Sequence, residues 1–115
     1  MTPGRLWGHP AARAEIRAAQ RYYADRRLGL GRAFLADVDA VLAFAREHPE
    51  MYPAFGEVVP TVRRALLHRF PYALVYEVGF GGANGLAVLT CYDLRQERPP
   101  RVAVAAVGRL TNRCS

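Results

Sequence analysis

The stretch Val62–Val78, VRRALLHRFPYALVYEV, decides how the rest of the chain must be arranged. Two apolar runs that also carry basic residues, Val62–Arg69 and Ala73–Val78, flank Phe70-Pro71-Tyr72. Valine, leucine and tyrosine favour the half-buried surface of a pleated sheet. Pro71 lacks an N–H donor and therefore marks a reversal between strands. The stretch predicts a β-hairpin at the centre of a small sheet, with the rest of the chain covering one face of it.

Two amphipathic helices are predicted before this hairpin. Pro10 suits a first helical turn, and apolar residues recur at helical spacing over about Ala11–Arg27 and about Gly31–Glu47. Gly29 is expected to cap the first helix, and Pro49 to end the second. Since the connection is only a few residues long, the helices should form an antiparallel pair. The residues expected to face the core are Ala12, Ile16, Ala19, Tyr23, Phe34, Val38, Val41, Leu42 and Ala45.

Further strands are predicted on both sides of the hairpin. Leu86–Tyr92 is a near-continuous apolar run of strand length, and Arg5-Leu6-Trp7 is expected to add a short strand. Val102–Val107 is either one more strand or a short docked segment. His48–Pro60 holds three prolines and is expected to be a loop. The loop side chains expected to pack on the helices are those of Met51, Tyr52 and Phe55.

Length and composition exclude several classes of protein. The 115 residues, 51% of them hydrophobic, provide one domain with one core. No apolar run reaches the roughly 18 residues of a membrane span, and the first ten residues lack the apolar region of a secretory signal. We therefore expect a cytoplasmic protein without membrane contacts. Cys91, Cys114 and the three histidines show no metal-binding spacing, so neither a metal nor another cofactor is expected.

The distribution of charge points to an anionic partner. The formal net charge is +6, and all sixteen basic residues are arginines. Residues 61–115 hold eight arginines against three acidic residues, whereas residues 1–60 hold eight against seven. Such an excess suits a polyanion or an acidic protein partner. The alternative is an ordinary solvated surface without such a partner.

The candidate functional side chains lie mainly on the predicted hairpin. Strand alternation points two sets of residues in opposite directions: Arg63, Ala65, Leu67 and Arg69 in one, and Val62, Arg64, Leu66 and His68 in the other. Arginines bind phosphates bidentately and neutralise charge in phosphoryl transfer, and tyrosine can act as a weak acid or base. For each arginine the alternative is a solvated rim position. For Tyr76, which shares a face with Tyr72 and Leu74, the alternative is core packing.

Residues 5–92 as a whole resemble the RelE/ParE superfamily of bacterial type II toxins, often described as plasmid stabilisation proteins. The matching elements occur in the family's order. They are His9-Pro10, Glu15-Ile16, Tyr22-Tyr23, Leu28-Gly29-Leu30-Gly31 with Phe34, Val38-Asp39, His48-Pro49, Tyr52-Pro53, Val62-Arg63-Arg64, Arg69-Phe70-Pro71-Tyr72 and Val75-Tyr76. The RFPY hairpin after two helices is the most specific of them.

The resemblance implies an α+β toxin of order β-α-α-β-β-β, a helical hairpin packed on a small, mainly antiparallel sheet. The toxin domain would span residues 1–93, with 94–115 as a divergent tail. The resemblance further implies an antitoxin that holds the toxin inactive, and we expect an acidic amphipathic segment of that antitoxin to bind the positive surface. RelE-like members cleave mRNA on the ribosome, whereas ParE-like members inhibit DNA gyrase and need no catalytic residues, so growth inhibition is implied by either route.

The resemblance also suggests roles for individual residues. In a ribonuclease, Arg63, Arg69, Tyr76 and Arg95 would be the catalytic set. The residues that would bind nucleic acid or a partner are Arg64, His68 and Arg98. In a gyrase inhibitor the same arginines would be contact residues. The chain has no lysine to act as a base, and Thr90-Cys91-Tyr92-Asp93 stands where many relatives carry a His-x-x-Arg-like segment. An inactive toxin relative, or a small non-catalytic binding module on the same scaffold, is the alternative.

Overall fold

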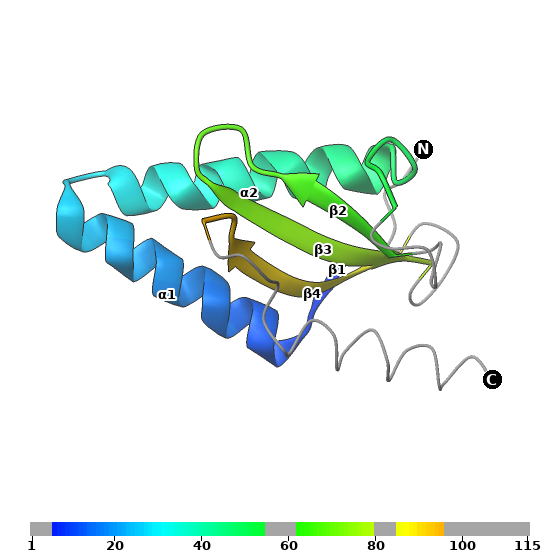
Figure 1. Ribbon diagram of the computed structural model, residues 1–115, viewed down its shortest axis with the longest axis horizontal. Coiled ribbons are helices and arrows are strands. Elements are labelled where there is room, and N and C mark those ends of the chain that lie inside the picture. Colours follow the sequence, from blue (N-terminus) through cyan, green and yellow to red (C-terminus); the bar gives the residue numbers. More distant parts are fainter. Residues whose placement is uncertain (1–5, 55–61, 80–84, 96–115) are drawn as a thin grey trace.

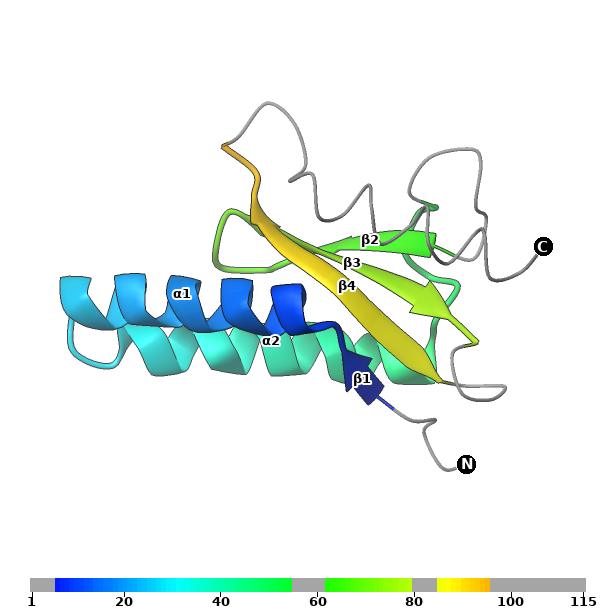
Figure 2. The same cartoon turned by 90° about the horizontal axis from the view of Figure 1, so that it is seen from below.

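The computed structural model describes residues 6–54, 62–79 and 85–95. Two helices lie side by side against one face of a four-stranded sheet (Figure 1 and Figure 2). The elements in chain order are β1 (Leu6–Gly8), α1 (Pro10–Arg26), α2 (Leu30–Glu47), β2 (Val62–Leu66), β3 (Tyr72–Val78) and β4 (Leu86–Asp93). The predicted α+β class, a helical pair on a small sheet, is confirmed.

The first helix begins where the sequence predicts. Pro10 occupies its first turn, and the His9 side chain accepts a hydrogen bond from the N–H of Ala11 through Nδ1 at 3.0 Å. The expectation for Gly29 is wrong, because α1 ends at Arg26 and its C-cap is Arg27, whose backbone is extended. Gly29 instead precedes α2 with φ of 82°, a conformation that glycine adopts without strain.

The sheet has the strand order β1-β4-β3-β2. β1 runs parallel to β4, and the other two pairs are antiparallel. β1 pairs only with Leu86–Val88, so the rest of that edge of β4 has no strand beside it among the described residues. β3 and β4 shift register between Val75 and Tyr76, which leaves Leu89 without an opposite residue and marks a β-bulge.

The hairpin turns earlier than the sequence suggests. β2 ends at Leu66, not at the predicted Arg69. The N–H of the next residue, Leu67, donates to the carbonyl of Tyr72 at 2.9 Å and closes the hairpin. The N–H groups of His68 and Arg69 donate to the carboxylate of Asp37 on α2 and therefore do not extend the sheet.

The main core fills the space between the helices and the sheet. The predicted helical stripes are confirmed, since Ala12, Ala19, Phe34, Val38, Val41, Leu42 and Ala45 are buried there and Ile16 and Tyr23 pack against them. The buried residues contributed by the strands include Ala65, Leu74, Tyr76, Leu86, Val88 and Cys91. The apolar run of β4 is buried along its whole length, as predicted for an interior strand.

The opposite face of the sheet carries a second apolar cluster. Its members are Val62, Ala73, Val75, Ala87, Leu89 and Tyr92. We call this side the open face, because no described helix or strand lies over it (Figure 2).

Two expectations for the loop after α2 have different outcomes. Tyr52 packs against the core, as predicted, whereas Met51 is exposed. The reason is a tight turn in which the N–H of Met51 donates to the carbonyl of His48. This turn directs the side chain of Tyr52, and not that of Met51, toward the core. Phe55, Arg98 and Val102–Val107 lie outside the described residues.

Candidate functional site

One end of the sheet gathers several of the predicted site residues. The β2–β3 turn, residues 67–71, adjoins the end of β4, because the N–H of Leu94 donates to the carbonyl of Pro71 at 2.8 Å and Tyr72 pairs with Asp93 (Figure 1). We call residues 64–72 together with 92–95 the turn end. Arg64, His68, Arg69 and Arg95 belong to it, whereas Arg63 and Tyr76 are directed elsewhere.

A buried carboxylate on α2 holds the turn in place. Asp37 is 5% exposed and lies within the apolar stripe of the helix. Its Oδ1 accepts the N–H of His68 at 3.1 Å, and its Oδ2 accepts the N–H of Arg69 at 2.7 Å. Hydrogen bonds to an ionised acceptor are stronger than neutral ones. Asp37 therefore positions the two basic residues of the turn from beneath.

The two basic side chains of the turn themselves point outward. His68 is 63% exposed, with Nδ1 lying 3.7 Å from Oδ1 of Asp37. The guanidinium of Arg69 lies 5.9 Å from the ring centre of Phe70, a cation–π contact at the outer limit of its range. Arg69 has no carboxylate at ion-pair distance among the described residues, so its charge remains available to a partner.

Arg64 lies on the open face, opposite in direction to Arg63, as strand alternation predicts. Its Nη1 donates to the hydroxyl of Tyr92 at 3.1 Å. The two residues are 28 positions apart in sequence. They meet because only β3 lies between β2 and β4 in the sheet. A neutral hydroxyl orients the guanidinium without cancelling its charge.

Arg95, in contrast, has a carboxylate partner. Its Nε lies 2.9 Å and 3.0 Å from the two carboxylate oxygens of Asp93, and its backbone N–H donates to the same group. The hydrogen bonds from Arg95 hold the pKa of Asp93 below its usual value and raise that of the guanidinium. Both groups stay ionised, and the net charge of the pair is zero.

Arg63 and Tyr76 face the helices and bind the chain that leaves α2. Nη1 of Arg63 donates to the carbonyl of Tyr52 at 2.6 Å and to that of Glu50 at 3.3 Å. The hydroxyl of Tyr76, a fully buried side chain, donates to the carbonyl of Pro49 at 2.9 Å. The two residues pair across the β2–β3 ladder and together fasten residues 49–52 to the sheet.

Tyr76 leads to a prediction at alkaline pH. Burial raises its pKa to about 12, although the nearby Arg63 acts in the opposite direction. The unfolded chain releases the phenol proton near pH 10, so this stabilisation is complete below about pH 10 and is lost as the pH rises toward 12. We expect the free energy of unfolding to fall by about 1.4 kcal/mol per pH unit in that window from this residue.

Urea unfolding between about pH 9 and about pH 11 measures this dependence. The Tyr76→Phe variant lacks the ionisable group, so its stability should fall less steeply with pH. Equal slopes for the two chains would contradict the assignment.

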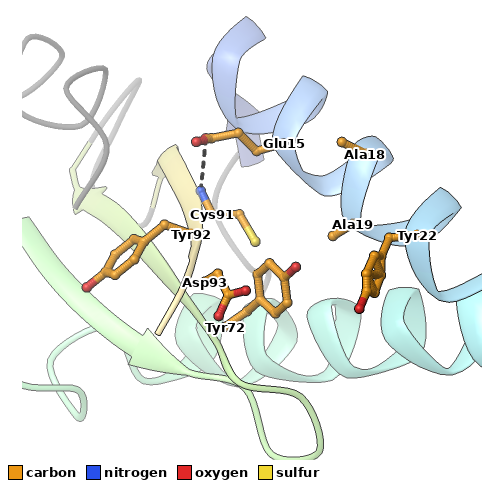
Figure 3. A pocket seen from close by; sticks show the side chains of 8 residues that line it. All are labelled: Glu15, Ala18, Ala19, Tyr22, Tyr72, Cys91, Tyr92 and Asp93. Carbon is orange, nitrogen blue, oxygen red and sulfur yellow. Dashed lines mark hydrogen bonds between the residues drawn. The ribbon is translucent and has the colours of Figure 1, made fainter. Parts of the chain in front are cut away.

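A cleft of about 280 Å³ opens beside the turn end, between α1 and β4 (Figure 3). It is lined by Glu15, Ala18, Ala19, Tyr22, Tyr72, Cys91, Tyr92 and Asp93. Glu15 reaches from α1 to the edge of β4 that β1 leaves uncovered, where its Oε1 accepts the hydroxyl of Thr90 at 2.8 Å and the N–H of Cys91 at 3.2 Å. Burial raises the pKa of the Cys91 thiol to about 12, so the reactive thiolate is scarce.

Sequence reasoning missed three residues that organise this region, Glu15, Asp37 and Tyr92. A signal for two of them was present in the sequence. Glu15 and Asp37 each stand three residues after an apolar core position of their helix, so each carboxylate interrupts a core-facing stripe. A buried carboxylate requires hydrogen-bond donors, but the spacing does not tell where in the fold those donors lie.

Two features are absent from the described residues, a cluster of metal ligands and a membrane-spanning helix. Nowhere in residues 6–54, 62–79 and 85–95 do three His, Cys, Asp or Glu side chains come together as a metal site would require. Within the same ranges, neither helix has the length and apolar character needed to cross a membrane.

The solved structures with a similar fold include two from toxin–antitoxin systems. A chain of the chromosomal ParDE toxin–antitoxin system from P. aeruginosa matches with a TM-score of 0.58 and 19% identity, covering 79% of this chain and 96% of that chain. A chain of the toxin–antitoxin complex RelBE2 from Mycobacterium tuberculosis matches with a TM-score of 0.53 and 13% identity, covering 80% and 99%. No family model and no curated protein matches the sequence.

These similarities define the class of fold. The chain has a RelE/ParE-like fold, which confirms the architecture that the sequence motifs predict. Both of these structural neighbours come from toxin–antitoxin systems. At identities below 20%, the similarity establishes the fold only. The activity has to be inferred from the residues of this chain.

Proposed function

We propose that this chain is the toxin component of a type II toxin–antitoxin pair and that a cognate antitoxin neutralises it by binding the turn end. The observation that carries the proposal is the state of Arg64 and Arg69 on a RelE/ParE-like fold. Their guanidinium groups contact a hydroxyl and an aromatic ring, and neither has a carboxylate partner among the described residues. Two uncompensated cations at one end of a sheet favour a partner of opposite charge.

The exposed apolar residues beside these cations define the partner more closely. Leu66 is 48% exposed and follows Arg64 by two positions, so it shares the open face. Leu94 is 37% exposed and follows Tyr92 by two positions. A segment with leucine-sized residues on one face and carboxylates on the other would satisfy both features. This chemistry is that of the acidic amphipathic antitoxin segment expected from the sequence.

The positions of the candidate catalytic residues favour action by binding. Arg63 and Tyr76 are engaged with backbone carbonyls of residues 49–52, and Arg95 is paired with Asp93. Of that set, only Arg69 has a charged group that neither a carboxylate nor a backbone carbonyl of the described residues engages. An active site for mRNA cleavage needs phosphate-binding and proton-transferring groups around one reacting bond. We therefore place inhibition of a target such as DNA gyrase ahead of mRNA cleavage.

Removing both free cations should weaken binding of the antitoxin. For Arg64→Ala/Arg69→Ala we expect the dissociation constant for the cognate antitoxin to rise about tenfold or more, and the difference from wild type to shrink at high salt. Calorimetry at low and high ionic strength provides the measurement. Arg17→Ala/Arg21→Ala is the matched control, since it removes the same charge from exposed positions of α1. Equal losses in both variants would mean that net charge, and not the turn end, attracts the partner.

Expression of the chain with and without the adjacent reading frame tests the wider proposal. Growth arrest that the neighbouring protein relieves would support a toxin, and absence of arrest would favour an inactive relative or a simple binding module. During arrest, intact mRNA with altered DNA supercoiling or DNA breaks would support gyrase inhibition. Ribosome-dependent mRNA cleavage that Arg69→Ala abolishes would overturn the preference for binding.

A further inference from the structure

The last turn of α2 and the loop that follows it carry exposed apolar side chains beside two carboxylates. Phe44 is 41% exposed and Met51 is 69% exposed, and Glu47 and Glu50 are exposed as well. His48 connects the two apolar residues, because its ring lies 4.8 Å from that of Phe44 and its carbonyl accepts the N–H of Met51. We call Phe44, Glu47, Glu50 and Met51 the α2 end. Large apolar side chains that are exposed close together mark an interaction site.

The charge of the α2 end is opposite to that of the chain as a whole. Residues 39–54 hold three acidic residues against one arginine, whereas the whole chain holds sixteen arginines against ten acidic residues. Neither Glu47 nor Glu50 has a basic side chain at ion-pair distance among the described residues. Arg63 binds the backbone carbonyl of Glu50 at 3.3 Å and not its carboxylate. Both negative charges therefore remain available to a partner.

The α2 end and the turn end do not meet within one molecule. Asp37 contacts the turn, and Glu47 follows ten residues later on the same helix, which is about 15 Å farther along its axis. Arg63 and Tyr76 fasten residues 49–52 near the other end of the β2–β3 ladder. In Figure 1, α2 accordingly finishes on the side of the sheet away from the β2–β3 turn. A contact between the two surfaces must therefore form between molecules.

The two surfaces are complementary in charge and in apolar character. The turn end presents the guanidinium groups of Arg64 and Arg69, which have no carboxylate partner among the described residues, next to the exposed Leu66 and Leu94. It fits a surface that combines carboxylates with large apolar side chains. The α2 end has this combination, so the chain itself carries a ligand for its own turn end.

We propose that the α2 end of one molecule docks on the turn end of a second copy of this chain. Glu47 and Glu50 pair with Arg64 and Arg69 of the second copy, and the apolar side chains of the α2 end cover its exposed leucines. Because the two surfaces lie at different places on the molecule, the contact is head-to-tail and each molecule can contact two others. An antitoxin at the turn end would compete with this contact, and that consequence alone rests on the proposed function.

Sedimentation velocity of the purified chain over a range of concentrations tests the proposal. At low ionic strength we expect the sedimentation coefficient to rise with concentration, and high salt should suppress the rise. Glu47→Arg/Glu50→Arg and Arg64→Glu/Arg69→Glu should each raise the dissociation constant about tenfold or more. The second variant lowers the positive net charge, so its loss of association cannot result from general repulsion between molecules.

Exchange of the charges provides the decisive comparison. The variant that combines all four substitutions has the net charge of the wild type and again presents opposite charges at the two surfaces. We expect it to associate as the wild type does. Arg17→Glu/Arg21→Glu, which changes the same number of charges at exposed positions of α1, is the matched control and should also leave association intact.

A measurement on the unmodified chain removes any dependence on how the variants fold. On dilution at low ionic strength, the NMR signals of the amides of Glu47, Met51, Leu66 and Arg69 should shift, and that of Arg17 should not. A wild-type chain that stays monomeric at every concentration would overturn the proposal and leave the α2 end to a different protein. Association that the control variant loses equally, or dilution shifts confined to other surfaces, would overturn it as well.

Discussion

Replacing Asp37 by alanine is expected to lower the free energy of unfolding by about 2–4 kcal/mol. The carboxylate is buried and accepts the backbone N–H groups of His68 and Arg69. Removing it leaves both donors without their acceptor and opens a gap beneath the turn. Urea unfolding measured by circular dichroism gives the change in stability. Hydrogen exchange at the two amides should accelerate more than at Leu67, whose N–H stays within the hairpin.

Two variants separate the hydrogen bonds from the charge. Asp39→Ala removes the same charge from an exposed site of α2, and we expect a change within about 0.5 kcal/mol. Asp37→Asn keeps one acceptor oxygen and should fall between the two. If Asp37→Ala costs no more than Asp39→Ala, the carboxylate does not hold the turn.

Replacing Phe34 by alanine is expected to cost about 3–5 kcal/mol, the largest effect of a single substitution that we predict. Phe34 is fully buried where both helices meet the turn end. Its ring stacks on Tyr23 with centroids 5.6 Å apart and meets Phe70 and Tyr72 edge-on at 5.3 Å and 5.2 Å. The loss combines the transfer free energy of the ring with the cavity that the rigid neighbours cannot fill.

Phe44→Ala is the matched control on the same helix. Phe44 is 41% exposed, and among the described residues its ring–ring contacts are with the partly buried Tyr52 and the exposed His48, so we expect a cost of about 1 kcal/mol or less. Thermal and urea unfolding of both variants measure the difference. Similar costs for the two substitutions would mean that the aromatic cluster around Phe34 is not the centre of the core.

The predicted elements that agree with the structure depend on local rules. These rules act within a few residues, so their effects can be predicted from the sequence. Examples are Pro10 at the start of α1, Pro71 in the reversal, and the helical spacing of Phe34, Val38 and Val41. The errors arose where a group far away in the sequence competes with strand pairing for backbone hydrogen bonds. The hairpin turns before Arg69 because a carboxylate on α2, more than thirty positions away, takes the N–H groups that would have extended β2.

The candidate site was less accessible to sequence reasoning than the fold. Strand alternation correctly predicted that Arg63 and Arg64 lie on opposite faces of the sheet. It could not predict which group each guanidinium contacts. Arg63 finds carbonyls of the loop after α2, and Arg64 finds a hydroxyl two strands away. Both contacts depend on strand order and register. The functional roles of Arg63, Arg64, His68, Arg69, Tyr76, Arg95 and Arg98 remain predictions.

The amino-acid sequence by itself determined the two helices, the central hairpin and the positive second half of the chain, because hydrophobic period, proline geometry and formal charge are local properties. Only the tertiary structure decided which arginines keep their charge free. Whether a guanidinium meets a carboxylate, a carbonyl, a hydroxyl or a ring is set by side chains brought together across strands and helices. At Arg64 and Arg69 these contacts leave the positive charge of the guanidinium uncompensated among the described residues, and at Arg95 a carboxylate cancels it.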